Sequence, residues 1–337
     1  MVLSDGQIPT YEALPYTWGP TENPVDLRID GVDGGSRLAV TQNLAEALQY
    51  LRYDDGRSRA LWIDAICVDR QNISERGHQV ARMADVYSKA RVVIVWLGPG
   101  RDGSALARGA LTDLGSEIEV NWTTKGITPL SREDYDQWTK EPLLFARNQD
   151  IINSIAHLLD RAWFTRLWIW QEIRLARNGA GIRCGYNSIS WASFRNAILC
   201  LHVKPTRKAS KLLSGIERVF PIIINYAGTL RNWHDLLEQT SGFQYSDDRD
   251  RVFSNLSLLR ISARSGLEPD YSKSTSEVYK GLICHDSDRL SRRRSTPGGT
   301  IEAIPFYHDL DVSLQAGTAS LFQQLMEPKL KRNKRNI

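Results

Sequence analysis

The chain has 337 residues, 42% of them hydrophobic and 24% charged, a composition typical of a globular protein that excludes a disordered or fibrous one. It has no run of 18 consecutive apolar residues and no signal-peptide pattern at its start, so we expect a cytoplasmic protein without a membrane span. Five basic residues among the last nine produce the net charge of +4, and the rest of the chain carries about −1. That distribution predicts no binding of nucleic acid.

The cysteines are few and far apart. Cys67, Cys184, Cys200 and Cys284 include no Cys-x-x-Cys pair. This spacing argues against a zinc ribbon, predicts no metal site, and is typical of proteins in a reducing compartment.

The first predicted elements are a hairpin and a helix. Residues 25–29 and 37–40 flank the Gly- and Asp-rich residues 30–35, whose composition favours a turn between two strands. Residues 43–53 then carry leucines at helical spacing, which predicts a short helix with one apolar face.

Residues 61–98 predict a complete β-α-β unit. The strand at 61–68 is apolar on both faces except at Asp64, which is typical of a strand covered by helices on both sides of a parallel sheet. An isolated carboxylate in such a strand is costly. Asp64 either accepts hydrogen bonds from a ligand at the sheet edge, or pairs with Arg76 or with amides of the following turn; we favour the structural interpretation.

The helix of this unit is predicted to begin near Ile73, because Asn72 and Glu75 are spaced as a capping box. Its apolar stripe consists of Val80, Met83, Ala84 and Tyr87. Residues 92–97 form the next buried strand, which the Gly-Pro-Gly sequence at 98–100 ends. That sequence is too short for a phosphate-binding glycine loop.

In open parallel sheets, ligands bind beyond the carboxyl ends of the strands. The sequence therefore predicts a site formed by residues 64–72 and 98–101. His78 lies at the start of the following helix, but no acid or cysteine stands at nucleophile spacing from it. We expect a surface or capping histidine rather than a proton carrier.

The remaining elements are predicted more coarsely. We expect helices at residues 104–118, 151–159 and 161–177, an irregular insert at 121–142, a tight hairpin at 181–191, and a helix that Ser190 caps and that runs to residue 201. The region after residue 205 is expected to be mostly helical.

Three blocks of this sequence resemble the fungal heterokaryon incompatibility (HET) domain, in the order that the family has them. Residues 11–19 are similar to its opening Tyr-x-Ala-Leu-Ser-Tyr-x-Trp-Gly strand. Residues 62–98 are similar to its central Trp-Ile-Asp-Ala-Ile-Cys run, its Glu-Arg and His-Gln-Val motifs and its Trp-Leu-Gly strand end, without a gap. Residues 161–172 are similar to its closing helix, which ends in Gln-Glu.

The resemblance divides the chain into four expected parts. Two later patches, at 246–253 and 268–279, resemble sequences that commonly follow the HET domain in fungal proteins. The four parts are a leader at residues 1–10, the HET domain at 11–178, a hairpin and helical extension at 179–283, and a poorly ordered basic tail at 284–337.

The chain departs from the family pattern at three places. Pro15 replaces the usual Ser, and because proline cannot donate to a strand ladder we expect the first strand to end at Leu14. Asp69 and Arg70 replace the usual Asn-Gln, so a ligand that the family holds with those amides would meet a charge of each sign. Ala162 replaces a helix-start Pro at little cost.

The order of the HET blocks is in turn similar to that of TIR domains. This second resemblance implies an α/β fold with a TIR-like, flavodoxin-type parallel sheet flanked by helices. In several TIR domains a glutamate on the late helix helps to cleave the nicotinamide–ribose bond of NAD, and Glu172 has the matching place here. NAD is thus implied as a substrate, with no cofactor required. We expect Asp64, Asp69 and Arg70, at the sheet edge, to form the pocket rim, together with Trp18 and Trp168, whose rings could stack on the nicotinamide or the adenine.

Glu172 has a structural interpretation as well. On a helix it shares a face with Trp168 and Leu175, and it is buried if that face packs on the sheet. Burial raises the pKa of a carboxyl group, which makes Glu172 either a functional acid or one half of a structural salt bridge to Arg166, Arg76 or another guanidinium. From the residues alone, the salt bridge is the simpler interpretation. The rim tryptophans likewise either stack on a ligand ring or fill the core.

The family resemblance implies a role in fungal non-self recognition, in which incompatible partners trigger programmed cell death. Two mechanisms of different classes fit the sequence. In the first, the domain associates with itself or with another incompatibility protein and hydrolyses NAD. In the second, it is a non-enzymatic signalling scaffold that acts through homotypic or partner contacts, and Glu172 is structural.

Overall fold

The computed structural model describes residues 10–29, 36–124, 126–130, 148–204, 210–224, 233–259 and 266–294. Residues 1–286 form one compact unit and residues 287–337 a second. The expected leader, the turn at 30–35, most of the insert at 121–142 and the basic tail after residue 294 lie outside the described residues.

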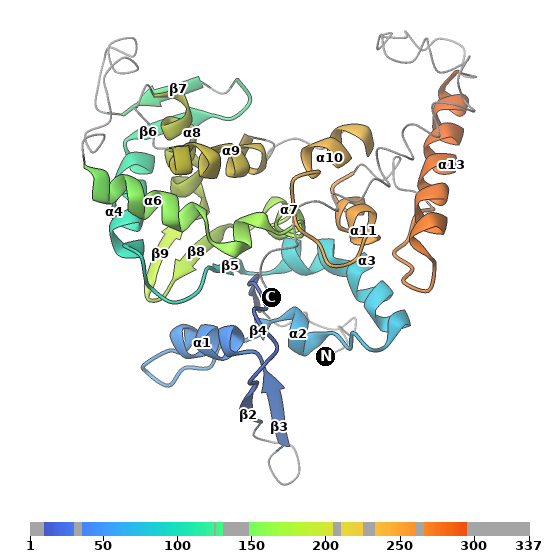
Figure 1. The fold of residues 1–337 in the computed structure, drawn as a ribbon, viewed down its shortest axis with the longest axis horizontal. Helices are drawn as coiled ribbons and strands as arrows, with labels where there is room; N and C mark the ends of the chain where they lie inside the picture. The colour runs from blue at the N-terminus through green and yellow to red at the C-terminus, as the bar shows by residue number, and fades with distance from the viewer. Residues whose placement is uncertain are drawn as a thin grey trace. The chain divides into compact units, whose positions relative to one another are not determined.

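Among the described residues, the central sheet has five strands in the order β4-β1-β5-β8-β9 (Figure 1). They are β1 (Glu12–Ala13), β4 (Leu61–Trp62), β5 (Val92–Trp96), β8 (Ala180–Cys184) and β9 (Asn187–Ser190). The first four run parallel, and β9 is antiparallel to β8. Numbered along the chain within this sheet, the order is 2-1-3-4-5, that of flavodoxin-type doubly wound sheets. The expected α/β fold class is therefore confirmed.

Different elements cover the two faces of the sheet. Successive residues of a strand point to opposite faces. Leu14 accordingly packs with α1 (Gln42–Leu51), whereas Ala13 packs with α3 (Ile73–Lys89). Helix α7 (Ile169–Arg174) packs against α3, which places it on the α3 side.

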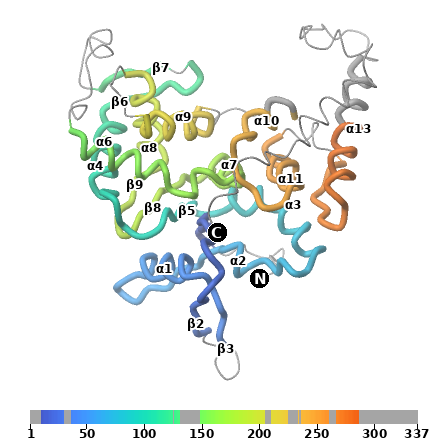
Figure 2. The backbone as a smooth tube through the Cα atoms, viewed as in Figure 1, coloured from blue at the N-terminus to red at the C-terminus, as the bar shows by residue number. Residues whose placement is uncertain are grey.

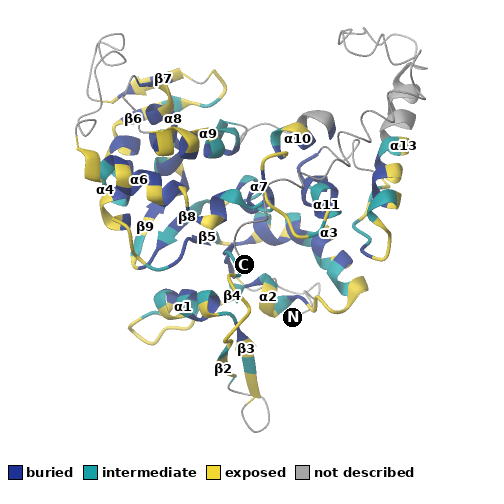
Figure 3. Cartoon of the chain, viewed as in Figure 1, coloured by how far each residue is buried: buried dark blue, intermediate teal, exposed yellow. Residues whose placement is uncertain are grey.

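A group of helices packs beside β8 and β9. It consists of α4 (Ser104–Ser116), α6 (Gln149–Leu159), α8 (Trp191–Val203) and α9 (Ser210–Ile224). The chain leaves the sheet after β5, passes through α4 and α6, and returns to β8 (Figure 2). Figure 3 shows extensive burial along α4, α6 and α8. At Gly115 a Cβ atom would lie 2.0 Å from the backbone oxygen of Ser193, so α4 and α8 approach too closely there for any side chain.

The extension after these helices is mostly helical, as expected. It contains α10 (Trp233–Gln239), α11 (Asp250–Leu256) and α13 (Thr275–Arg294). Helix α11 packs against both α3 and α7, so the extension contacts the domain where the predicted site lies. Within the described residues, no helix combines the length and apolar character that crossing a membrane requires.

Elements with local sequence signals form as predicted. The hairpins β2–β3 (Val25–Ile29 and Ser36–Val40) and β8–β9 are present, and Ser190 caps α8 by accepting from the N–H of Ser193. Strand β1 ends at Ala13, one residue before the expected end. A hairpin of β6 (Ile118–Asn121) and β7 (Gly126–Pro129) stands where an irregular insert was expected to begin.

The predicted strand at 61–68 is wrong beyond its first two residues. Strand β4 ends at Trp62, and Asp64 begins the short helix α2 (Asp64–Cys67). The N–H of Cys67 donates to the carbonyl of Ile63 at 2.8 Å, and the Asp64 carboxylate accepts from the next backbone N–H at 2.8 Å. An apolar run of this length is compatible with a strand or a buried helical turn, and periodicity alone does not distinguish them.

The predicted helix at 161–177 is also wrong, because it is broken in the middle. A 3-10 turn (Ala162–Thr165) precedes α7, and Arg166 between them has an extended backbone with φ −79° and ψ 139°. The cause is a distant contact: the N–H of Leu167 donates to the carbonyl of Gln244 at 2.9 Å, and Arg166 forms a single bridge with the same residue. A strand-like contact with the extension thus replaces one helical turn.

Candidate functional site

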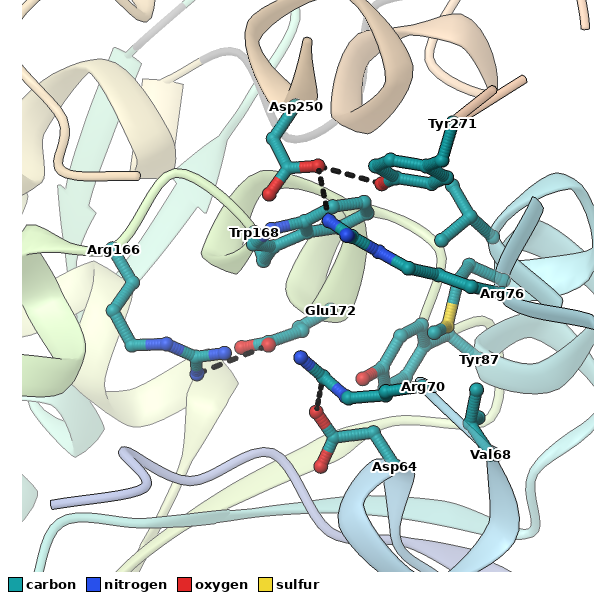
Figure 4. A pocket seen from close by; sticks show the side chains of 12 residues that line it. Asp64, Val68, Arg70, Arg76, Tyr87, Arg166, Trp168, Glu172, Asp250 and Tyr271 are labelled. Atoms are coloured by element: carbon teal, nitrogen blue, oxygen red, sulfur yellow. Dashed lines mark hydrogen bonds and ion pairs between the residues drawn. The ribbon is translucent and has the colours of Figure 1, made fainter. Parts of the chain in front are cut away.

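A cavity of about 60 Å³ lies beyond the carboxyl end of β4, against α3 and α7 (Figure 4). It has room for about two water molecules. It is lined by Asp64, Val68, Arg70, Arg76, Val80, Met83, Tyr87, Arg166, Trp168, Glu172, Asp250 and Tyr271. This is the sheet edge at which ligands of doubly wound folds bind. Asp250 and Tyr271 come from the extension, so a distant part of the chain closes the cavity.

The Glu172 carboxylate is buried and held by two partners. The residue is 3% exposed. Its Oε2 accepts a hydrogen bond of 2.8 Å from the indole Nε1 of Trp163, and its Oε1 lies 3.2 Å from Nη1 of Arg166. Burial raises the pKa of Glu172, while the charge of Arg166 and the Trp163 hydrogen bond oppose that rise. The carboxylate therefore depends on these partners to carry a charge in the protein interior.

The ion pair also acts on Arg166. Burial tends to lower the pKa of this guanidinium, but the charges of Glu172 and Asp64 outweigh it and raise the pKa. Arg166 is therefore a permanent cation beside the cavity. Its pairing with Glu172 was one of the two salt bridges that the sequence suggested, and Arg76, the other suggested partner, contacts different residues.

Asp64 and Arg70 form a second ion pair at the rim, opposite Glu172 (Figure 4). Asp64 Oδ2 accepts from Nη2 of Arg70 at 2.8 Å and from the indole Nε1 of Trp18 at 3.1 Å. The Arg70 guanidinium lies over the Trp18 ring, 3.4 Å from its centroid. Burial lowers the pKa of Arg70, and Asp64 opposes that change. Three predicted rim residues thus form one contact group, in which Arg70 covers a face of the indole.

Two buried tyrosines beside the cavity are affected by the same carboxylates. Burial raises the pKa of Tyr87, and Glu172 and Asp64 raise it further. Burial and Asp64 also raise the pKa of Tyr16, whose buried hydroxyl has no hydrogen-bond partner within the described part of the chain. Both phenols therefore remain protonated donors at neutral pH.

A third group of charges was not predicted. Nη2 of Arg76, on α3, lies 3.1 Å from Asp247 Oδ2 and 3.6 Å from Asp250 Oδ1. Asp250 in turn accepts a hydrogen bond of 2.6 Å from the Tyr271 hydroxyl. Burial raises the pKa of Asp250, whereas hydrogen bonds from Arg249 outweigh burial and lower the pKa of Asp247. The two acids belong to the patch at 246–253 noted in the sequence, but nothing in that patch indicates contact with α3.

Not every predicted site residue reaches the cavity. Asp64, Arg70, Trp168 and Glu172 line it, and Trp18 contacts it through its bond to Asp64. Asp69 does not line it: its carboxylate accepts from two backbone N–H groups of the turn before α3, at 3.0 and 3.4 Å. His78 is exposed and also lies outside the lining.

The side chain of Arg161 binds the loop at residues 98–101 through hydrogen bonds to backbone carbonyl groups. The Arg161 guanidinium donates to the carbonyls of Leu97, Pro99 and Arg101 at 3.2 to 3.4 Å. The side chain is 7% exposed. This loop is therefore tied to the 3-10 turn by its carbonyl groups and does not line the cavity. Across the described residues, no three His, Cys, Asp or Glu side chains gather as a metal site would need.

Fold and cavity define the class: an α/β protein with a flavodoxin-type sheet whose carboxyl edge carries ion pairs of carboxylates and guanidiniums, of which the pair of Glu172 and Arg166 is the most deeply buried. Residues 11–172 match the family model described as "Heterokaryon incompatibility protein (HET)". These residues are a HET domain, as the three sequence blocks indicated. The match ends on Glu172, so Asp247, Asp250 and Tyr271 lie outside it.

Two curated fungal proteins are similar to the chain. "Heterokaryon incompatibility protein 6, OR allele" of Neurospora crassa is 29% identical over 79% of this chain and 45% of that protein. "Vegetative incompatibility protein HET-E-1" of Podospora anserina is 29% identical over 37% of this chain and 9% of that protein. The chain spans less than half the length of either relative. No solved structure matches it, so the likeness to TIR domains stays a prediction.

Proposed function

We propose that this chain acts in fungal non-self recognition, and that its HET domain, on self-association, cleaves the nicotinamide–ribose bond of NAD with Glu172 as the essential carboxylate. The observation that carries this proposal is the position of Glu172, a buried carboxylate lining a cavity at the carboxyl edge of a flavodoxin-type sheet. The names of the two relatives, a heterokaryon and a vegetative incompatibility protein, support the biological role.

The proposed reaction needs a carboxylate and a water molecule. Cleavage passes through an oxocarbenium-like state at the ribose C1′. The bonding electron pair leaves with the nicotinamide nitrogen and neutralises its positive charge; water then adds to C1′ and loses a proton, which gives nicotinamide and ADP-ribose. Glu172 stabilises the positive ribose electrostatically or accepts hydrogen bonds from its hydroxyls. Arg166 and Trp163 hold that carboxylate in place.

The other cavity residues have supporting parts in this proposal. Trp168 is the half-buried aromatic side chain of the lining that can stack on a base or on nicotinamide. Trp18 is less available, because Arg70 already covers one face of its ring. The pair of Asp64 and Arg70 forms the opposite rim and offers both an acceptor and a donor to ribose hydroxyls.

The test is nicotinamide release from NAD by the purified full chain, concentrated or on a crowding matrix. We expect release by the wild type and a loss of about a hundredfold or more in Glu172→Gln, which keeps the shape and removes the charge. Glu217→Gln, the same change at an exposed position of α9, is the matched control. No release by the wild type would contradict the enzymatic proposal. Release unchanged in Glu172→Gln would contradict only the role of that residue.

A second function is favoured by one observation. Both oxygens of Glu172 have protein partners, as expected of a carboxylate in a structural ion pair. The cavity beside it is also small, with room for about two water molecules. In this alternative the chain is a signalling scaffold that acts through contacts with itself or with another incompatibility protein. Cell death on overexpression separates the two functions. A scaffold retains killing in a stably folded Glu172→Gln variant, whereas an NAD-cleaving enzyme loses it.

A further inference from the structure

The three guanidinium groups that line the cavity have different kinds of partners (Figure 4). Arg70 and Arg166 pair with carboxylates of the HET domain itself. Arg76 does not: among the described residues, its ion pairs are with Asp247 and Asp250 of the extension. The domain therefore presents one cation at the cavity whose counter-charges come from a separate part of the chain.

The surroundings of Arg76 are those of an anion-binding arginine. Its Cζ lies 3.5 Å from the centroid of the Tyr271 ring, so this cation–π contact also comes from the extension. One terminal nitrogen, Nη2, contacts both carboxylates, and the side chain is 26% exposed. Arginine in this arrangement presents parallel N–H donors that match a phosphate as well as a carboxylate.

The two acids would keep partners if Arg76 were taken by another anion. Asp247 receives two hydrogen bonds of 2.8 Å from Arg249, and Asp250 receives the 2.6 Å hydrogen bond from Tyr271. Since a buried charge is costly chiefly when it is left without any partner, releasing Arg76 costs less here than breaking an isolated pair. The contact is therefore suited to exchange.

We expect the extension to shift when the cavity binds a dinucleotide. Ligand sites usually measure about 300 Å³ or more, far above the observed 60 Å³. The Asp250 and Tyr271 side chains form the part of the wall that does not belong to the HET domain. The segment before Tyr271 lies tightly on α3, because a Cβ at Gly77 would be 2.7 Å from the backbone oxygen of Pro269.

We propose that Arg76 binds the diphosphate of the dinucleotide substrate, and that Asp247 and Asp250 occupy this guanidinium as internal anions until the substrate displaces them. The identity of the dinucleotide rests on the proposed function. Displacement withdraws the extension from the cavity, so binding of the diphosphate and opening of the site are one event. The apparent affinity for the diphosphate is then lower than the intrinsic affinity, because only the molecules in which the extension has released Arg76 can bind.

The test measures binding of inorganic pyrophosphate to the full chain by titration calorimetry. We expect Arg76→Gln to bind about tenfold more weakly than the wild type, and the control Arg82→Gln, on the same helix but outside the lining, to bind like the wild type. Asp250→Asn and Gly77→Ala should bind several-fold more tightly, because each weakens the hold of the extension. Gly77→Ala alters no charge, and circular dichroism checks the fold of each variant.

The proposal would be overturned by an affinity unchanged in Arg76→Gln, by no gain in either Gly77→Ala or Asp250→Asn, or by no pyrophosphate binding by any variant. Orthophosphate binding as tight as pyrophosphate would also overturn it, since it would indicate a site for a single phosphate group. The titration involves no bond cleavage and is repeated in Glu172→Gln. If pyrophosphate binds as expected but NAD is not cleaved, the proposed function is wrong. If NAD is cleaved but pyrophosphate does not bind as expected, the proposed role of Arg76 is wrong.

Discussion

The pKa of the Glu172 carboxyl group is raised by burial and lowered by its two partners, and the resulting pKa sets the pH dependence expected for NAD cleavage. Burial raises its pKa above the ordinary value of 4.5, and the opposing effects of Arg166 and Trp163 do not cancel that rise. Only the ionised form stabilises a positive ribose. Cleavage should therefore fall as the pH is lowered through this raised pKa, and the acid limb of the rate profile should lie above pH 4.5.

Initial rates of nicotinamide release between about pH 4 and pH 8 measure this limb, with a tenfold fall expected for each pH unit below it. The far-ultraviolet circular dichroism at each pH separates titration of the site from unfolding. An acid limb at or below pH 4.5 in a folded protein would show that the charge on Arg166 dominates over burial.

The site residues that the sequence predicted lie within the family motifs, and two pairs of them are close together along the chain. Asp64 and Arg70 are six residues apart, and Glu172 follows Trp168 by one helical turn, so a single chain segment brings each pair to the cavity. Arg76 and Asp247 are separated by 171 residues, and no local pattern specifies that they meet. Sequence reasoning found the carboxylates of the domain but not their neighbours from the extension.

At the scale of elements, local signals predicted several elements that neighbouring residues hold together. The capped helix α3 and the hairpin β8–β9 depend on neighbouring residues, and both form. The helix expected at 161–177 depends on whether Arg166 stays helical, and its bridge to Gln244 prevents this. Asp64 begins a helical turn rather than lying within a strand, because its carboxylate accepts from the next N–H group. Both errors occurred at the site, where tertiary contacts and polar groups override propensity.

Two glycines of helix α4 give a matched stability prediction. Gly115→Ala should lower the free energy of unfolding by about 1–3 kcal/mol, because its Cβ would lie 2.0 Å from the Ser193 carbonyl oxygen and force α4 and α8 apart. Gly109→Ala, where a Cβ meets nothing within 4 Å, should raise it by about 1 kcal/mol through helix propensity. Urea unfolding curves compare both variants with the wild type. Equal effects of the two changes would mean that α4 and α8 do not pack as described.

At the scale of the whole molecule, the extension completes the cavity of the HET domain. The sequence patches at 246–253 and 268–279 supply Asp250 and Tyr271 to its wall. The cavity bounded by this contact measures about 60 Å³, which is small for a ligand site. If the self-associated chain is the form that cleaves NAD, as proposed, it is also the form in which the extension has opened. Self-association and opening are then expected to be coupled.

This coupling predicts how NAD cleavage depends on protein concentration. In dilute solution the wild type should be closed, so its nicotinamide release per mole of protein should rise about tenfold or more as the concentration passes through the range of self-association. Gly77→Ala, in which the extension is displaced from α3, should already be active when dilute and should show a shallower rise. Light scattering on the same samples reports the oligomeric state, and Arg82→Gln serves as the control. A specific activity that is independent of concentration in both proteins would contradict the coupling. A rise of equal steepness in both proteins would mean that NAD cleavage requires self-association alone and does not depend on opening of the extension.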